Sequence, residues 1–65
     1  KAIGLLQDAV KTYPQHPAIH YHLGMAYLKQ GNKKLAKQEL NKVLELAPKA
    51  PFAEEVKRAL KEIGG

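Results

Sequence analysis

The spacing of apolar residues along the chain predicts helices. From Lys1 to about Tyr13, apolar residues recur three and four positions apart, which is the repeat of one helix face. The same spacing resumes at Pro17 or Ala18 and runs to Gln30, and it returns from Lys33 to about Ala47. A last segment, opened by Pro51, has a single apolar stripe and is charged at its other positions. We therefore expect an all-α fold with four helices.

Prolines, a glycine and an asparagine mark the ends of these helices. Pro14 and Pro48 end the first and third, because the residue before a proline is pushed out of the α region. Pro17 suits a first helical turn, where its missing N–H would be unpaired anyway. Gly31 can take a positive φ after the second helix, and Asn32 is a favourable N-cap for the third. The second and third helices are therefore joined by a tight turn.

The chain repeats itself with a period of 34 residues. At this shift, the same chemical classes recur along the first and third helices and at the prolines that follow them. The matched pairs are Ala2 with Ala36, Leu6 with Leu40, Ala9 with Val43, Val10 with Leu44, Pro14 with Pro48 and Pro17 with Pro51. One repeating unit therefore contains two helices.

A period of 34 residues with two helices per unit resembles the tetratricopeptide repeat. The first helix of that family carries Trp-x-x-Leu-Gly-x-x-Tyr, and the residues at this spacing here are His20, Leu23, Gly24 and Tyr27. Its second helix carries a small residue, an aromatic residue four positions later and a terminal proline, which here are Ala36, Leu40 and Pro48. His20 and Leu40 depart from the family's aromatic residues.

The resemblance implies a division of the chain and a function. Residues 1–16 correspond to the second helix of a truncated repeat, 17–50 to a complete repeat and 51–65 to a C-terminal capping helix. In the last segment Lys57 and Arg58 replace the Leu-Gly pair, as in the polar-faced helices that end such arrays. The implied architecture is a short right-handed superhelix of antiparallel helical hairpins. The implied function is a scaffold that binds a peptide or protein segment on its concave face, without catalysis.

The second helix is apolar on two faces. His20, Leu23 and Tyr27 share one face, and the small residues Gly24 and Ala36 allow the antiparallel neighbour to pack closely. The opposite face and its edges carry Ala18, Tyr21, His22, Met25, Leu28 and Lys29. In tetratricopeptide arrays this face lines the concave surface, so the resemblance implies that these six residues contact a partner. A neighbouring repeat or helix packed on the same face is the alternative, and the sequence leaves both open.

The first helix has more apolar residues than one hairpin partner can cover. These residues are Ile3, Leu5, Leu6 and Val10. Either the segment belongs to a longer array, or its uncovered side pairs with another copy of the chain. We expect self-association through this helix. The alternative function is therefore a purely structural cap of a larger array whose exposed helix mediates self-association.

Three histidines, His16, His20 and His22, lie within seven residues. At about 100° per residue, His20 and His22 point roughly 160° apart on a helix and cannot chelate one ion. Pro17 places His16 outside the helix, and residues 16–24 contain no carboxylate. We expect no metal site. We interpret His20 as a packing residue with local hydrogen bonds and His22 as an edge residue of the partner-binding face.

Composition limits the remaining chemistry. The 65-residue chain has no cysteine or serine, and Thr12 is its one side-chain alcohol outside tyrosine. It also has no glycine-rich phosphate-binding motif, so we expect neither catalysis nor a cofactor. The formal net charge is +5, but ten of the 11 basic residues are lysines without interleaved aromatic residues, which disfavours nucleic acid as a partner. No apolar run is long enough for membrane insertion. The compartment stays open between the cytoplasm and, for an exported bacterial protein, the periplasm.

Overall fold

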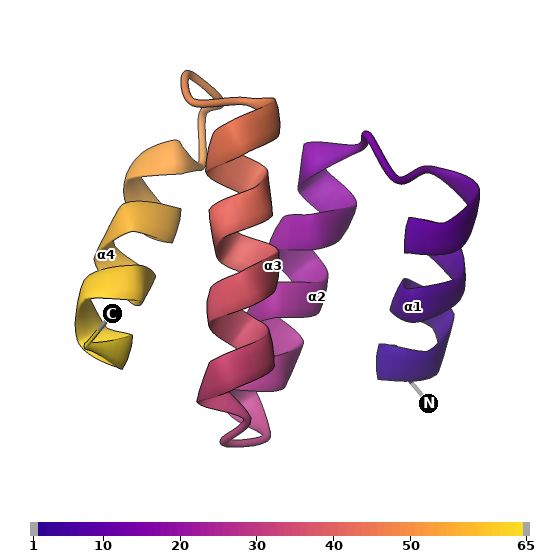
Figure 1. Cartoon of the computed structure of the whole chain (residues 1–65), viewed down its shortest axis with the longest axis horizontal. Coiled ribbons are helices and arrows are strands. Elements are labelled where there is room, and N and C mark those ends of the chain that lie inside the picture. Colours follow the sequence, from indigo (N-terminus) through magenta and orange to yellow (C-terminus); the bar gives the residue numbers. More distant parts are fainter. Residues whose placement is uncertain (1, 65) are drawn as a thin grey trace.

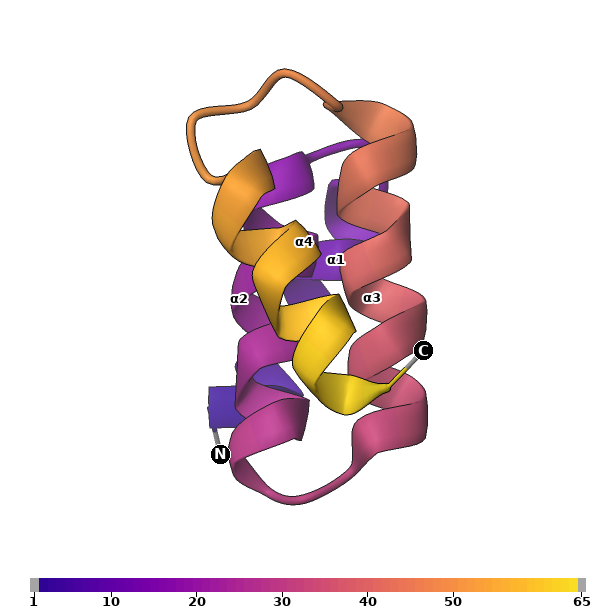
Figure 2. The ribbon, with the colours of Figure 1, turned by 90° about the vertical axis from the view of Figure 1, so that its left-hand side faces the viewer.

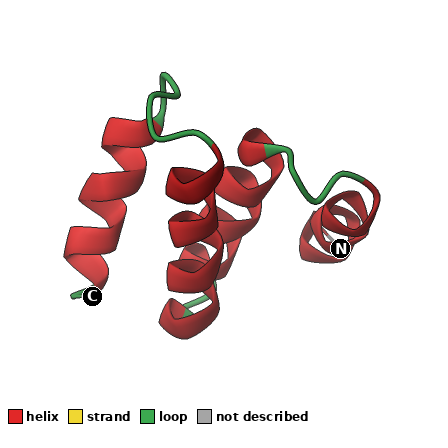
Figure 3. Cartoon of the chain, turned by 45° about the horizontal axis from the view of Figure 1, so that its top comes forward, coloured by secondary structure: helices red, strands yellow, loops and turns green. Residues whose placement is uncertain are grey.

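The computed structural model describes residues 2–64 and consists of helices joined by short turns (Figures 1 and 3). The helices are α1 (Ala2–Thr12), α2 (Pro17–Lys29), α3 (Lys33–Leu46) and α4 (Ala53–Ile63). Lys1 and Gly65, which belong to the first and last predicted segments, lie outside the described residues. The all-α prediction is confirmed, and each helix end lies within two residues of its predicted position.

The α2–α3 turn has the geometry that its sequence predicts. Gly31 follows α2 with φ of 86°, and the N–H of Asn32 donates to the carbonyl of Tyr27 at 2.9 Å. The side chain of Asn32 then accepts a hydrogen bond from the N–H of Leu35 at 3.3 Å. The predicted N-cap is therefore confirmed. Pro17 occupies the first turn of α2, also as predicted.

The fourth helix begins later than predicted. Its first residue is Ala53, while Pro51 lies in the preceding turn and Phe52 occupies the N-cap position. The N–H of Ala53 donates to the carbonyl of Ala50 at 2.9 Å, so the chain makes an additional turn before the helix. At its other end, α4 stops at Gly64, which has a left-handed backbone with φ of 88°.

Successive helices run in opposite directions, and each packs on its neighbour in the chain (Figure 1). In Figure 2, α4 lies in front of the α2–α3 hairpin and crosses it. The Cα atoms span 27 × 26 × 15 Å, so the molecule is a thin stack of helical hairpins. None of the described helices combines the length and the apolar character needed to cross a bilayer.

The core consists of two clusters of buried side chains that meet at the α2–α3 hairpin. The first cluster joins α2 to α3 and contains Leu23, Tyr27 and Ala36. The second joins α3 to α4 and contains Leu40, Val43, Val56 and Ala59. Leu28 and Ile63 pack against both clusters. The two clusters therefore form one continuous core, in which α2 and α3 are shared.

Helices α2 and α3 approach closely at Gly24. A Cβ atom at this position would lie 2.8 Å from both Cγ and Cδ2 of Leu40, and 3.3 Å from Cβ of Glu39. Leu40 is fully buried, so any shift of its side chain would disturb the core around it. The close approach of the hairpin therefore depends on glycine. The small residue predicted on the other helix, Ala36, is also fully buried.

Candidate functional site

An open cleft lies between α2 and α4. Its lining residues are Met25 and Leu28 from α2, and Glu55, Arg58, Ala59 and Glu62 from α4. The cleft holds about 170 Å³ of space, less than the roughly 300–1,000 Å³ of a typical small-molecule pocket. Its apolar floor and charged wall suit a few side chains of another protein better than an enclosed small molecule.

Met25 is the accessible apolar side chain of this cleft. It is 37% exposed, and together with Leu28 it also lines a second hollow that reaches Lys29. Leu28 is half-buried because it packs against both core clusters. Three of the six residues predicted to bind a partner, Met25, Leu28 and Lys29, therefore line one continuous surface along α2.

Tyr21 was expected on the same open surface, but α4 and its N-cap residue engage it. Its ring stacks on Phe52, with centroids 4.9 Å apart and planes inclined by 26°. Its hydroxyl donates to Oε2 of Glu55 at 3.0 Å. Burial raises the pKa of Tyr21 above its ordinary 10.0, and the hydrogen bond to Glu55 and the negative charge of that carboxylate act in the same direction. At Tyr21 the surface is thus occupied by a neighbouring helix of the same chain.

The other two residues of the predicted partner surface lie outside this cleft lining. Ala18 is half-buried near the start of α2. His22 is exposed, and its ring centroid lies 5.5 Å from that of Tyr21. Neither residue belongs to the set that lines the cleft between α2 and α4. The predicted surface is therefore narrower in the structure, and its accessible part lies toward the end of α2.

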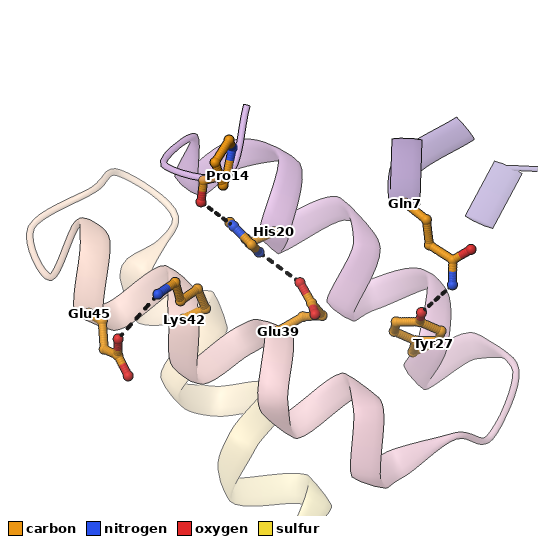
Figure 4. Close-up of polar contacts among 7 residues, drawn as sticks. All are labelled: Gln7, Pro14, His20, Tyr27, Glu39, Lys42 and Glu45. Carbon is orange, nitrogen blue, oxygen red and sulfur yellow. Dashed lines mark hydrogen bonds and ion pairs between the residues drawn. The ribbon is translucent and has the colours of Figure 1, made fainter. Parts of the chain in front are cut away.

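His20 connects three segments of the chain (Figure 4). It is only 5% exposed, and its Nε2 donates to the carbonyl of Pro14 at 2.7 Å. Its Nδ1 lies 2.7 Å from Oε1 of Glu39, a contact that is an ion pair when the ring is protonated. The ring thus joins the α1–α2 turn to α2 and α3. Among residues 2–64, no cluster of three or more histidine or acidic side chains is arranged to hold a metal ion.

A sequence model of the tetratricopeptide repeat matches residues 1–63. The chain belongs to the tetratricopeptide repeat family. Repeats of this family generally mediate protein–protein interaction, and its members are typically scaffolds without catalytic activity. Comparison with curated proteins gives no match, and comparison with solved structures gives none either.

The residues at the family's motif positions in this tetratricopeptide repeat lie mostly in the core. The buried ones are His20, Leu23, Gly24, Tyr27, Ala36 and Leu40. The hydroxyl of Tyr27 also accepts a hydrogen bond from Nε2 of Gln7 on α1 at 2.7 Å (Figure 4). Pro48 differs, because it is exposed in the turn after α3. Its ring prevents α3 from continuing and needs no packing partner to do so.

Most of the apolar residues of α1 are covered within the chain. Ile3, Leu6 and Val10, which were expected to serve self-association, pack against the α2–α3 cluster instead. They lie three and four positions apart and so share the helix face that α2 covers. Leu5 points away from that face and is 74% exposed. Of the four residues predicted to mediate self-association of the tetratricopeptide chain, Leu5 is therefore the most exposed.

The sequence did not predict that α4 forms one wall of the cleft. Its helical pattern places Glu55, Arg58 and Glu62 on a solvent-exposed face. They are exposed, but they also line the cleft beside Met25. The 34-residue repeat contains the signal that could have found them. It pairs Tyr21, Met25 and Leu28 of the complete repeat with Glu55, Ala59 and Glu62.

Helix α4 differs from α2 at the position that determines hairpin packing. Arg58 stands one period after Gly24, whose environment leaves no room even for a Cβ atom. A helix could not pack on this face of α4 as closely as α3 packs on α2. The face also carries Lys57 at the position that corresponds to Leu23, and both Lys57 and Arg58 are exposed. This face of α4 is thus polar, whereas the matching face of α2 is apolar and buried.

Proposed function

We propose that this tetratricopeptide chain is a scaffold that binds a segment of another protein in the cleft between α2 and α4. The observation that carries the proposal is Met25, a flexible apolar side chain that stays 37% exposed on the cleft floor. Methionine adapts its shape to different apolar partners, which suits a binding surface. The segment would place an apolar side chain against Met25 and Leu28.

Charged side chains around this floor would orient the bound segment. Glu62 and Arg58 stand on the α4 side, and Lys29 lies at the other edge of Met25. Within residues 2–64, Arg58 takes part in no ion pair, so its guanidinium is available to a carboxylate of the partner. An apolar centre with a charged rim is the usual composition of a protein interface.

Peptides selected from a random displayed library provide the test, because they supply defined ligands of measurable affinity. Met25→Ser should weaken the selected peptides about three- to sixfold, since full burial of such a side chain contributes about 1.5–3 kcal/mol and only its exposed 37% is left to bury on binding. Leu5→Ser is the matched control, because it removes an exposed apolar side chain from α1, away from the cleft. The proposal fails if Met25→Ser leaves binding unchanged, and weakening by Leu5→Ser alone would place the binding surface on α1.

A second candidate function is a structural cap that associates with another copy through α1. Two observations favour it: the 74% exposure of Leu5 and the polar face of α4 at Lys57 and Arg58. One exposed leucine per copy supports only weak association, no tighter than about 1 mM. Translational diffusion measured by NMR should therefore slow as the concentration rises, and Leu5→Ser should abolish the change. A diffusion coefficient independent of concentration would refute self-association.

A further inference from the structure

Four lysines surround the turn between α2 and α3. They are Lys29, Lys33, Lys34 and Lys37. All are exposed except Lys37, which is half-buried. The tight turn at Gly31 places the last turn of α2 beside the first turn of α3. Figures 1 and 2 show that this turn projects beyond the neighbouring ends of α1 and α4. The four lysines therefore stand at or near one protruding end of the molecule, which we call the lysine tip.

Among residues 2–64, no ion pair compensates the positive charge of the lysine tip. Four of the six acidic residues are engaged elsewhere: Glu39 with His20, Glu45 with Lys42, Glu54 with Lys57, and Glu55 with Tyr21. The other two are Asp8 on α1 and Glu62, which lines the cleft. Within the described part of the chain, none of the four tip lysines forms an ion pair.

Helix stability favours Lys29 in the last turn of α2 but gives no reason for Lys33 and Lys34 at this position. Lys33 and Lys34 stand in the first turn of α3, which contains no acidic residue. The N-terminal end of a helix carries partial positive charge, so cations there destabilise the helix. An external negative charge would offset the repulsion between these lysines and the positive end of the helix. It would also offset the repulsion among the four lysines. The arrangement is thus unfavourable in the isolated chain and favourable against an anionic partner.

We propose that the lysine tip binds the surface of an anionic phospholipid membrane. Lys33 and Lys34 are exposed at a projecting turn, where a flat surface can meet both of them. Lys29, at the same turn, also borders the hollow beside Met25. Anionic bilayers attract lysines that come within a Debye length, about 8 Å at physiological salt. Residues 29–37 contain neither an aromatic residue nor an arginine, the side chains that stack on bases or read them, so nucleic acid fits less well. The bound chain would lie on the membrane without entering it.

Sedimentation with lipid vesicles tests this proposal. The intact chain should bind vesicles containing about one-third phosphatidylserine, should not bind pure phosphatidylcholine vesicles, and should be released by high salt. Lys33→Gln with Lys34→Gln should weaken partitioning about 25-fold, because each lysine near such a surface contributes about fivefold. The double variant should melt at no lower temperature than the wild type, since it removes cations from the helix N-terminus. A loss of binding would therefore not reflect unfolding.

A matched control separates local contact from net charge. Lys11→Gln with Lys49→Gln removes the same charge from exposed residues at the opposite end of the molecule, in the last turn of α1 and the α3–α4 turn. This control should keep its vesicle binding. Equal weakening of both double variants, or no binding by the wild type, would overturn the proposal. The membrane proposal would also be overturned if the chain bound duplex DNA or a polyglutamate peptide more tightly than vesicles at the same ionic strength. The tighter ligand would then indicate the class of partner.

Discussion

Replacing glycine by alanine should have opposite effects at two positions of this chain. In a helix interior, alanine is more favourable than glycine by about 0.5–1 kcal/mol. At Gly4 in α1, a new Cβ would meet nothing within 4 Å, so the helix should gain this stability. At Gly24 in α2, the same Cβ would lie 2.8 Å from two atoms of Leu40. There the gain in helix propensity competes with a steric clash.

The clash at Gly24 should exceed the gain. Carbon atoms in contact normally lie about 3.5–4.0 Å apart. One of the two clashing atoms is Cγ of Leu40, close to the backbone, and this side chain is fully buried. Relief therefore requires α2 and α3 to move apart and to disturb both core clusters. Overpacking of this kind costs about 3 kcal/mol at the upper end of the usual range, which leaves Gly24→Ala about 2 kcal/mol less stable than the wild type.

Thermal unfolding followed by circular dichroism measures both effects. A chain of this size has a free energy of unfolding of about 3–10 kcal/mol, and 1 kcal/mol shifts its melting temperature by about 4–8 °C. Gly24→Ala should therefore melt about 8–16 °C lower, and Gly4→Ala about 2–8 °C higher. If Gly24→Ala were as stable as the wild type, the close approach of α2 and α3 would not need glycine.

Two further substitutions test the polar contacts. His20→Ala should lower the free energy of unfolding by about 3 kcal/mol, because the buried ring's two polar contacts of 2.7 Å, with the carbonyl of Pro14 and with Glu39, are both lost. His22→Ala removes an exposed ring and should change the free energy of unfolding by less than about 0.5 kcal/mol. Equal urea midpoints for the two alanine variants would contradict this reasoning. Tyr21→Phe tests the raised pKa of Tyr21, which burial and then Glu55 produce. A folded-state pKa above the unfolded value of 10.0 favours folding below that pH, and this contribution is lost as pH rises through the folded pKa. Urea unfolding should therefore show the wild type's advantage over Tyr21→Phe shrinking at alkaline pH, and a constant difference would refute the assignment.

The helices could be predicted because residues that act on their own backbone mark most of their ends. Pro14 and Pro48 block a preceding helix wherever they occur, and Gly31 and Asn32 form their turn through local hydrogen bonds. At the start of α4, a contact that is distant in sequence accompanies the local turn. Phe52 stacks on a ring of α2, and the chain makes an additional turn before the helix begins.

The candidate site could be predicted only in part, because a helical pattern shows which residues are polar but not what faces them. Met25 was predicted on an accessible apolar face and is accessible. Arg58 was predicted to be exposed and is exposed, but it borders Met25 only because α4 crosses α2. Tyr21 has the spacing of the open face, yet Phe52 and Glu55 engage it. These relations arise from tertiary packing, which periodicity within one helix does not describe.

The sequential packing of the helices has a consequence for how the chain folds. Helices that are neighbours in sequence make its main interhelical contacts, so the loops that must close are short and the contact order is low. Such topologies fold in microseconds to milliseconds. Leu28 packs against both core clusters, so forming the α2–α3 hairpin creates the surface on which both outer helices dock. Folding should begin at this hairpin, and amide hydrogens of α1 should exchange with solvent before those of α3.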